Sequence, residues 1–423
     1  MRPENPNATF ASLGIAPNVL QRLDEMKFLH PTPIQEKAIP QGIAGEDLIG
    51  IAQTGTGKTL AFAIPVMQRV AATKKMGLVI LPTRELALQV DETFRKVGGP
   101  FGLRTAVLIG GGSMHTQLKD IRRKPHVVIA TPGRLIDHMD QKHISLGTVG
   151  ILVLDEADRM LDMGFEPQLK RILTGVPTER QTLLFSATMP EQIAQIARKY
   201  MKQPLRVEVA RSGTAAEHVD QEVFIVSKAD KLSLLQKVLG EYRGTILVFS
   251  RTKHGAKKIA RAVRQMGHTS AELHSNRSLA QRKQALEGFK SGAYRVLVAT
   301  DIAARGIDVT GIELVLNFDL PDHTEDYVHR IGRTGRAGRA GKAISFAVPE
   351  QKNDIRQIER LINMRLSVKS HTGETLERFV EAPASVPERP PRAYRSGGRP
   401  FHRQGRSGQS GHSRHRPTKN PSR

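Results

Sequence analysis

Short apolar runs that alternate with amphipathic helical segments constrain the fold of this chain more than any other feature. Each run is bounded by Gly, Pro or a charged residue, which is typical of strands buried on both faces of a parallel sheet. Helical patterns such as residues 85–97 lie between the runs, as in βαβ units of a doubly wound sheet. The predicted strands of the first half are residues 47–51, 78–81, 105–109, 127–130, 151–154 and 182–185.

The alternation stops once and then begins again. Residues 210–218 are polar and read as a linker. After them come predicted strands at 222–226, 245–249, 269–273, 295–299, 314–318 and 343–347, with helices such as 255–266 and 278–290 between them. We therefore predict two α/β domains, residues 1–208 and 221–370, joined by a linker at 209–220.

The end of the chain has a different composition. From about Ala382 onward, ten Arg or Lys residues stand against one acid, Glu388, and apolar residues nearly vanish among Pro, Gly and Ser. Such a segment cannot bury enough apolar area to offset its ordering entropy. We expect residues 371–423 to form a disordered basic tail.

The charge balance narrows the class of partner. The formal net charge is +23, which favours a polyanion, nucleic acid first and an anionic membrane surface second. The chain has no Cys, so disulfides and thiol-ligated metal sites are excluded. The first ten residues lack the apolar core of a signal peptide, and no segment has the roughly 20 apolar residues of a membrane span. These features predict a soluble cytoplasmic protein.

A Gly-rich loop after the first predicted strand is the strongest single motif. It matches the phosphate-binding pattern G-x-x-x-x-G-K-[ST], except that Ala replaces the first Gly. The glycines let backbone N–H groups turn toward phosphate oxygens, the Lys can reach the β- and γ-phosphates, and the final Thr can ligate Mg²⁺. The loop consists of Ala52, Gln53, Thr54, Gly55, Thr56, Gly57, Lys58 and Thr59.

An acidic cluster follows the predicted strand at 151–154. That strand delivers Asp155 to the carboxyl edge of the sheet, where such folds bind ligands. There Asp155 can hold Mg²⁺ and Glu156 can orient and deprotonate the attacking water. An acidic run at a helix start is often only a complement to the helix dipole, but the phosphate loop upstream favours the catalytic interpretation.

With these two motifs, the chain resembles the DEAD-box family of superfamily 2 helicases, whose name is spelled by residues 155–158. The resemblance covers about residues 10–367, and residues 155–165, DEADRMLDMGF, are most similar to the bacterial RhlE-like subgroup. It implies two tandem RecA-like domains, ATP and Mg²⁺ as cofactors, and poorly processive, local unwinding of RNA. We expect a monomer that contacts the sugar-phosphate backbone of a single RNA strand. The ribosome or the RNA-decay machinery is expected as a further partner.

Several first-domain segments then match the family's motifs. Phe28 and Gln35 resemble its adenine-recognition element, because Phe28 offers a stacking face and the Gln35 amide can both donate and accept. The family usually has Gly where this chain has Lys27. Asp158, Ser186 and Thr188 resemble the elements that couple hydrolysis to unwinding. The RNA-backbone elements correspond to Pro82, Thr83, Arg84, Gly111, Gly112, Thr131 and Arg134.

The second domain carries the remaining matches. Arg330, Arg333 and Arg336 are costly to pack unless anions are near, and Arg333 and Arg336 resemble the family's arginine fingers. The resemblance assigns RNA contacts to Thr252, Arg282 and Thr300 and a ribose contact to Asp308. Two departures are Leu279, where the family has Gln, and residues 274–276, which read His-Ser-Asn instead of His-Gly-Asp.

Three alternatives differ in what they bind. A DNA-translocating helicase would use the same ATP site, and stimulation by DNA instead of RNA would identify it. A passive RNA-binding chaperone would have a silent ATP site, which Lys58, Glu156 and Arg333 argue against. Membrane-surface binding by the tail lacks the apolar face of an amphipathic helix.

Overall fold

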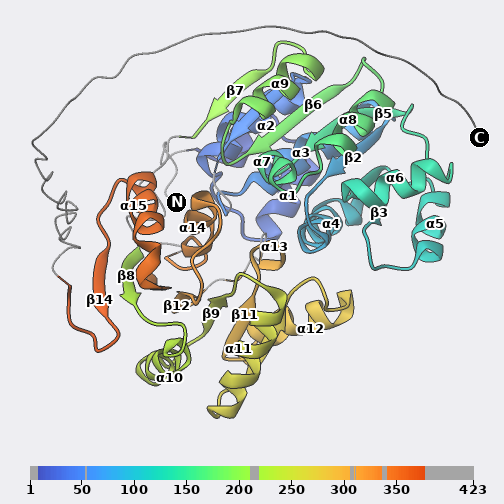
Figure 1. The fold of residues 1–423 in the computed structure, drawn as a ribbon. Helices are drawn as coiled ribbons and strands as arrows, with labels where there is room; N and C mark the ends of the chain where they lie inside the picture. The colour runs from blue at the N-terminus through green and yellow to red at the C-terminus, as the bar shows by residue number, and fades with distance from the viewer. Residues whose placement is uncertain are drawn as a thin grey trace, which may run out of the picture. The chain divides into compact units, whose positions relative to one another are not determined.

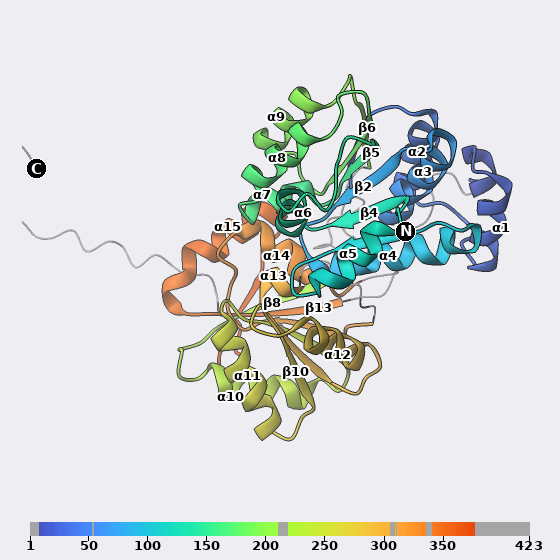
Figure 2. The ribbon, with the colours of Figure 1, turned by 90° about the vertical axis from the view of Figure 1, so that its right-hand side faces the viewer.

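Two parallel sheets form the framework of the molecule. The computed structural model describes residues 8–52, 55–209, 219–304, 309, 311–335 and 341–376. Within this part, each sheet has seven strands, and every pairing between named strands is parallel. Figures 1 and 2 show helices on both faces of each sheet.

The first sheet has the strand order β3-β4-β2-β5-β6-β1-β7. At its centre, Val79 of β2 lies between Ile129 of β4 and Val153 of β5, and the register of β2 against β5 shifts once, between Met76 and Gly77. The strands are β1 Leu48–Ile51, β2 Met76–Ile80, β3 Thr105–Leu108, β4 Val127–Ala130, β5 Val149–Leu154, β6 Gln181–Ser186 and β7 Leu205–Glu208.

The second sheet repeats this order as β10-β11-β9-β12-β13-β8-β14. Strand β8 therefore takes the place of β1, β12 that of β5 and β13 that of β6. The strands are β8 Val219–Ile225, β9 Ile246–Phe249, β10 Ser270–Leu273, β11 Val296–Ala299, β12 Leu314–Asn317, β13 Gly341–Ala347 and β14 Ser367–Ser370.

The helices begin at residues whose side chains or rings suit a helix start. Thr83, Ser113, Thr252 and Ser278 each accept a hydrogen bond from a backbone N–H of the first turn. The first-domain helices are α1 Pro17–Glu25, α2 Pro33–Ala44, α3 Lys58–Thr73, α4 Arg84–Gly98, α5 Met114–Arg122, α6 Pro132–Asp140, α7 Ala157–Asp162, α8 Glu166–Gly175 and α9 Glu191–Tyr200, with 3₁₀ turns η1 Phe10–Leu13 and η2 Gly99–Phe101. The second-domain helices are α10 Lys231–Glu241, α11 Lys253–Gln265, α12 Leu279–Lys290, α13 Asp301–Ala304, α14 Thr324–Ile331 and α15 Lys352–Ile362, with the 3₁₀ turn η3 Pro349–Gln351.

Each sheet separates two apolar cores. Alternate residues of a strand point to opposite faces, so Leu78 and Ile80 join one cluster while Val79 joins the other. Leu247 and Val248 divide in the same way between the two clusters of the second sheet. Burial on both faces explains why the strands read as continuous apolar runs.

The predicted fold class is confirmed, and the structure adds two strands. All twelve predicted runs contain strands, but β7 and β14 were not predicted. Both are short edge strands with exposed residues, so they show no apolar run. The predicted tail, apart from residues 371–376, and the core of the linker, residues 210–218, lie outside the described residues. Within the described part, no helix is long and apolar enough to span a membrane.

Candidate ATP and RNA sites

The phosphate loop joins β1 to α3. Gly55 and Gly57 have φ angles of 88° and 90°, the left-handed conformation that glycine adopts without strain. Lys58 is the first residue of α3 and is buried, with its Nζ donating to the carbonyl of Ala52 at 2.7 Å. The loop therefore presents a helix N-terminus and a Lys amino group at the carboxyl end of β1. Gln53 and Thr54 lie outside the described residues.

Gln35 fastens α2 to this loop. Its Nε2 donates to the carbonyl of Gly57 at 2.9 Å, and its Oε1 accepts from the backbone N–H of Thr32 at 2.9 Å. An amide has two N–H donors and two acceptor lone pairs, so one of each remains for a purine edge. Phe28, 37% exposed, lies upstream on the same segment, after Lys27, whose φ of 61° matches the glycine conformation expected there.

Asp155 is a buried carboxylate at the carboxyl end of β5. Its backbone N–H donates to the carbonyl of Ile80, and its Oδ1 accepts from the N–H of Glu156 at 2.9 Å. Burial raises the pKa of the Asp155 carboxyl to about 7, with Glu156 and Asp158 acting in the same direction and Lys58 against them. A cation beside Asp155 would offset this desolvation.

Glu156 has an unusual backbone. Its φ of 53° and ψ of 48° lie in the left-handed region, and among the described non-glycine residues with positive φ it is the only buried one. The side chain is buried, and its Oε2 lies 3.1 Å from Nη1 of Arg159. A buried carboxylate on a strained backbone favours a catalytic role for Glu156 over a purely structural one.

Asp158 connects the acidic cluster to the end of β6. Its Oδ2 accepts from the backbone and hydroxyl of Thr188 at 2.8 and 2.9 Å and from the N–H of Ala187 at 3.1 Å, while its own N–H donates to Ser186 Oγ at 3.2 Å. Burial would raise the pKa of Asp158, but the Lys58 charge and the Thr188 hydrogen bonds outweigh it and keep that pKa below its ordinary value. The ionised Asp158 thus connects the end of β5 to the end of β6.

The loops after β2, β3 and β4 meet at the same edge of the first sheet. Thr83 caps α4, and the neighbouring Pro82 lies in the short loop after β2. The Arg84 guanidinium lies so close to Gly111 that a Cβ there would collide with it. Arg134 Nη1 donates to the carbonyl of Gly112 at 3.3 Å, which ties the loop after β3 to α6. Thr131, at the N-cap of α6, is also buried.

Gln117 organises these loops and was not predicted. Its Nε2 donates to the carbonyl of Ile109 at 2.9 Å, and its Oε1 lies 3.4 Å from Arg134 Nη1 and 3.1 Å from His138 Nε2. One buried amide thus holds the loop after β3 and the start of α6 in register. No motif signals this residue, because a lone Gln on a helix has no distinctive spacing.

Arg330 and Arg333 have different surroundings. Arg330 is 1% exposed and forms a two-pronged ion pair with Asp301, at 2.5 and 2.6 Å. It is therefore a packing residue of the second domain. Arg333 is also buried, and its Nε donates to the carbonyl of His329 at 3.1 Å. Arg336 and Asp308 lie outside the described residues.

Three predicted RNA contacts of the second domain lie at strand ends or on a helix. Thr252 follows β9 and caps α11, accepting from the N–H of Gly255 at 3.0 Å. Thr300 follows β11 and is half-buried. Arg282 of α12 is buried, and its Nη2 donates to Glu85 Oε2 at 2.8 Å. A contact between Arg282 and RNA would have to compete with this ion pair.

Comparisons with known proteins agree with this geometry. Residues 32–196 match the DEAD/DEAH box helicase family and residues 230–338 match the helicase conserved C-terminal domain. The ATP-dependent rRNA helicase RRP3 of Debaryomyces hansenii is 43% identical over 362 residues, covering 85% of this chain and 76% of the relative. The DEAD-box ATP-dependent RNA helicase CshA of Bacillus cereus is 41% identical over 361 residues, covering 85% and 69%. The chain belongs to the DEAD-box RNA helicases.

Solved structures extend the likeness to the whole DEAD-box framework. S. cerevisiae Dbp5 bound to RNA and ADP BeF3 matches with a TM-score of 0.78 at 30% identity, covering 86% of this chain and 96% of Dbp5. Mss116p bound to ssRNA and AMP-PNP matches with a TM-score of 0.79 at 27% identity, covering 88% and 81%. This DEAD-box protein is accordingly an ATP-dependent RNA helicase with two RecA-like domains, and family membership decides against the passive chaperone and the DNA translocase.

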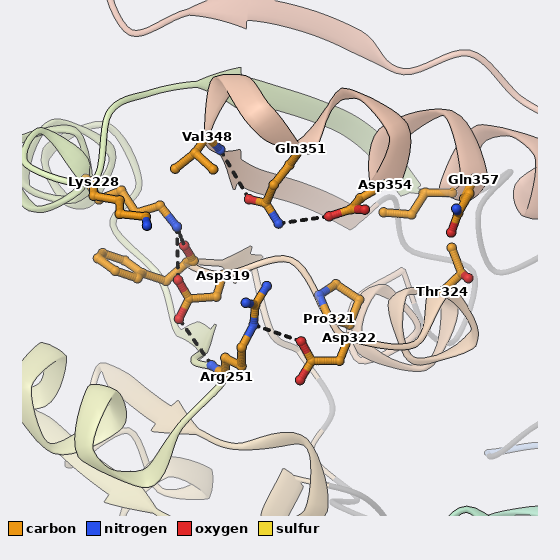
Figure 3. A pocket seen from close by; sticks show the side chains of 13 residues that line it. Lys228, Arg251, Asp319, Pro321, Asp322, Thr324, Val348, Gln351, Asp354 and Gln357 are labelled. Carbon is orange, nitrogen blue, oxygen red and sulfur yellow. Dashed lines mark hydrogen bonds and ion pairs between the residues drawn. The ribbon is translucent and has the colours of Figure 1, made fainter. Parts of the chain in front are cut away.

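A cavity of about 550 Å³ lies in the second domain of the helicase, away from the phosphate loop. Figure 3 shows its lining residues at the ends of β8, β9, β12 and β13 and on α15. Lys231 and Asp319 form an ion pair of 2.9 Å at its wall, and Arg251 pairs with Asp322 at 3.0 Å. The cavity was not predicted, because of its lining residues only Arg251 lies in a recognisable motif, the RNA-backbone element around Thr252.

Proposed function

We propose that the buried cluster at the ends of β1 and β5 binds and hydrolyses ATP. Lys58 would contact the β- and γ-phosphates, and Glu156 would orient and deprotonate the attacking water. Gln35 and Phe28 would hold the adenine. The observation that carries this proposal is the crowding of three buried carboxylates beside Lys58, with Asp158 tied to Ser186 and Thr188.

Asp155 and Thr59 fit the needs of Mg²⁺. The ion is usually held by one or two carboxylates together with substrate phosphates, instead of by an all-protein cage. Asp155 supplies a buried carboxylate, and its burial raises its pKa despite the nearby Lys58 charge. When bound there, Mg²⁺ would neutralise phosphate charge, while Thr59 and Asp155 orient it.

The second domain would complete the catalytic site. Arg333 and Arg336 would stabilise charge on the γ-phosphate in the transition state, and Asp308 would contact the ribose. Among these residues, Arg333 is buried two residues after the end of α14, and Arg330 in the last turn of that helix pairs with Asp301. A helix end anchored in this way supports the assignment, since a finger must be held in place to act.

We propose that RNA lies along the strand-end loops of both domains. Donors there, such as Thr83, Arg84 and Thr252, suit phosphate oxygens and carry no base code. The expected substrates are structured RNAs of ribosomal or RNA-decay assemblies, which the rRNA helicase among the relatives supports. The RhlE-like subgroup, a monomeric state and a cytoplasmic location remain part of this proposal and rest on the sequence alone.

The replacement Glu156→Gln tests the assigned base. The variant should bind ATP and RNA but lose roughly 10²- to 10⁴-fold in RNA-stimulated ATP hydrolysis, the usual contribution of a general base. Glu179→Gln, whose side chain is 83% exposed on the same domain, is the matched control and should hydrolyse ATP normally. Turnover by Glu156→Gln at the wild-type rate would remove Glu156 from the mechanism.

A further inference from the structure

Helix α11 exposes a row of cations that have no acidic partner. Its buried face consists of Ala256, Ile259, Ala260 and Val263, which pack against the second sheet. The exposed residues on its other side are Lys253, His254, Lys257, Lys258, Arg261, Arg264 and Gln265. Figures 1 and 2 show this helix beside β10 and β11, at the side of the second domain.

Helix α11 contains no acid with which these cations could pair. In the first domain, Lys96 pairs with Glu92 and Lys170 with Glu166 within one helix, each at 2.6 Å. No acid occurs between Glu241 and Glu272. Within the part of the chain that the structure describes, neither Lys257, Lys258 nor Arg261 forms an ion pair.

The arrangement of like charges on α11 opposes folding of the helix. Lys253, Lys257 and Arg261 follow one another at intervals of four residues, so they are neighbours on the helix surface and repel each other. Their field reaches the end of β10, where burial, Arg282 and then His254, Lys253 and Lys257 lower the pKa of His274. A bound polyanion would remove this repulsion.

We propose that the exposed face of α11 binds the phosphate backbone of an RNA duplex arm that adjoins the strand held at Thr252. Thr252 is the N-cap of α11, so the row of cations begins at a proposed RNA contact and leads away from it. The 13 residues of α11 span about 20 Å, enough to follow about six phosphates of one strand.

A duplex fits this face better than a single strand or an acidic protein. Many single-strand sites stack bases on aromatic side chains, but the exposed face of α11 carries no Phe, Tyr or Trp, so it offers contacts to phosphates only. Protein interfaces of standard size have an apolar centre, whereas every exposed residue of this face is polar. A straight row of cations suits the regular phosphates of a duplex.

The test replaces Lys257, Lys258 and Arg261 together with Gln, which preserves helix propensity. Affinity is measured with the full chain, across a salt series, for an RNA hairpin with a single-stranded extension and for the extension alone. We expect weaker binding of the hairpin only. If all three cations meet phosphates, the wild-type advantage should shrink about 40-fold between 50 and 200 mM salt, because each contact contributes about 0.9 to the logarithmic slope.

Two controls make the outcome decisive. Replacing Lys352, Arg356 and Arg360 of α15 with Gln changes the net charge equally at a distance from α11 and should leave the affinity for both RNAs unchanged. The inference rests on the proposed contact of Thr252, so Thr252→Val should weaken binding of both RNAs. If only the Thr252 variant behaves as expected, duplex binding by α11 is refuted, whereas RNA binding at the strand-end loops is supported. Equal weakening of both RNAs by the α11 variant, or no weakening, would also overturn the duplex assignment.

Discussion

The two domains have the same strand order but place different chemistry at equivalent strand ends. In the first sheet, β1 leads to Lys58 and β5 leads to Asp155. In the second sheet, the strands in those places are β8 and β12, and they lead to Lys231, the first residue of α10, and to Asp319. A Lys and an Asp therefore occupy corresponding positions in both domains.

The difference lies in how the two pairs are connected. Within the described residues, Lys58 forms no ion pair with Asp155, and its amino group bonds to the loop at Ala52. In the second domain, Lys231 Nζ lies 2.9 Å from Asp319 Oδ1 and donates to the carbonyl of Phe318 at 2.6 Å. The Lys231 ammonium is therefore satisfied by partners of its own domain.

The loop before the Lys explains this difference. In the phosphate loop, Gly55 and Gly57 have positive φ angles, which let backbone N–H groups turn toward a bound phosphate. Residues 226–230 contain no Gly, so the loop before Lys231 has no such residue to turn at. The other oxygen of Asp319 accepts from the N–H of Arg251 at 3.2 Å, which braces the segment before Thr252. The same fold thus supports nucleotide chemistry in one domain and an internal brace in the other.

The largest expected effect separates the two lysines. Lys58→Met should lower RNA-stimulated ATP turnover by roughly 10²- to 10³-fold, because a preorganised charge on the transferring phosphate is lost. Lys231→Met should leave the turnover number of the folded protein near the wild-type value at saturating RNA and ATP. Steady-state ATPase assays on both variants, with circular dichroism as a check of folding, measure this. An equal loss in the two variants would show that the domains are not divided as proposed.

A smaller effect is expected on stability when the brace in the second domain is removed. Asp319→Asn should cost about 1–3 kcal/mol in the free energy of unfolding, since the buried Lys231 loses its charged partner. Burial would raise the pKa of Asp319, but Lys231 and the N–H of Arg251 outweigh it and lower that pKa. The ionised Asp319 therefore stabilises the fold fully above the pKa of Asp in the unfolded chain, near 4. This stabilisation is lost as the pH falls through the lower pKa of Asp319 in the folded protein.

Urea unfolding of wild type and Asp319→Asn, at neutral pH and in acid, measures this difference. It should be present at pH 7 and shrink in acid, where the wild-type carboxylate becomes protonated. Asp322→Asn is the control in the same cavity, because Asp322 is 64% exposed and its pair with Arg251 should contribute little. Equal stability of Asp319→Asn and wild type at pH 7 would contradict the brace.

Sequence patterns predicted the parts of the fold that are buried on both sides and missed those that are not. The central strands are continuous apolar runs, and their order follows from βαβ connections. Strand β7, with only Val207 buried, and β14, with none of its residues buried, pair along one edge and carry exposed side chains. Nothing in their composition separates them from loops, so only the backbone pairing reveals them.

The candidate sites divide in a similar way. Lys58, Asp155 and Glu156 could be predicted because phosphate chemistry requires particular residues at a particular spacing. The Lys231–Asp319 pair could not, since the two residues are far apart in sequence and each is an ordinary surface type until the sheet brings them together. Arg330 was grouped with the fingers by spacing alone, and only the fold shows that its partner is Asp301.

The smallest expected effect comes from making the end of β6 resemble the end of β13. In the first domain the Thr188 hydroxyl bonds to Asp158, whereas β13 is followed by Val348, which has no hydroxyl. Thr188→Val removes one hydrogen bond to a charged acceptor, worth about 1.5 kcal/mol because the backbone N–H groups of residues 187 and 188 still donate to the same Asp158 oxygen. The rate of ATP hydrolysis should stay within about twofold of wild type, because Lys58 and Glu156 are unchanged. The connection between Asp158 and the segment after β6 should become weaker. The amount of RNA duplex opened per ATP hydrolysed should then fall about tenfold, as the lost hydrogen-bond energy corresponds to a factor of that order.

Parallel unwinding and ATPase assays measure this ratio, with Thr174→Val, an exposed helical site of the same domain, as the control. Equal losses in hydrolysis and unwinding would place Thr188 in the catalytic step instead of in the connection between the two strand ends.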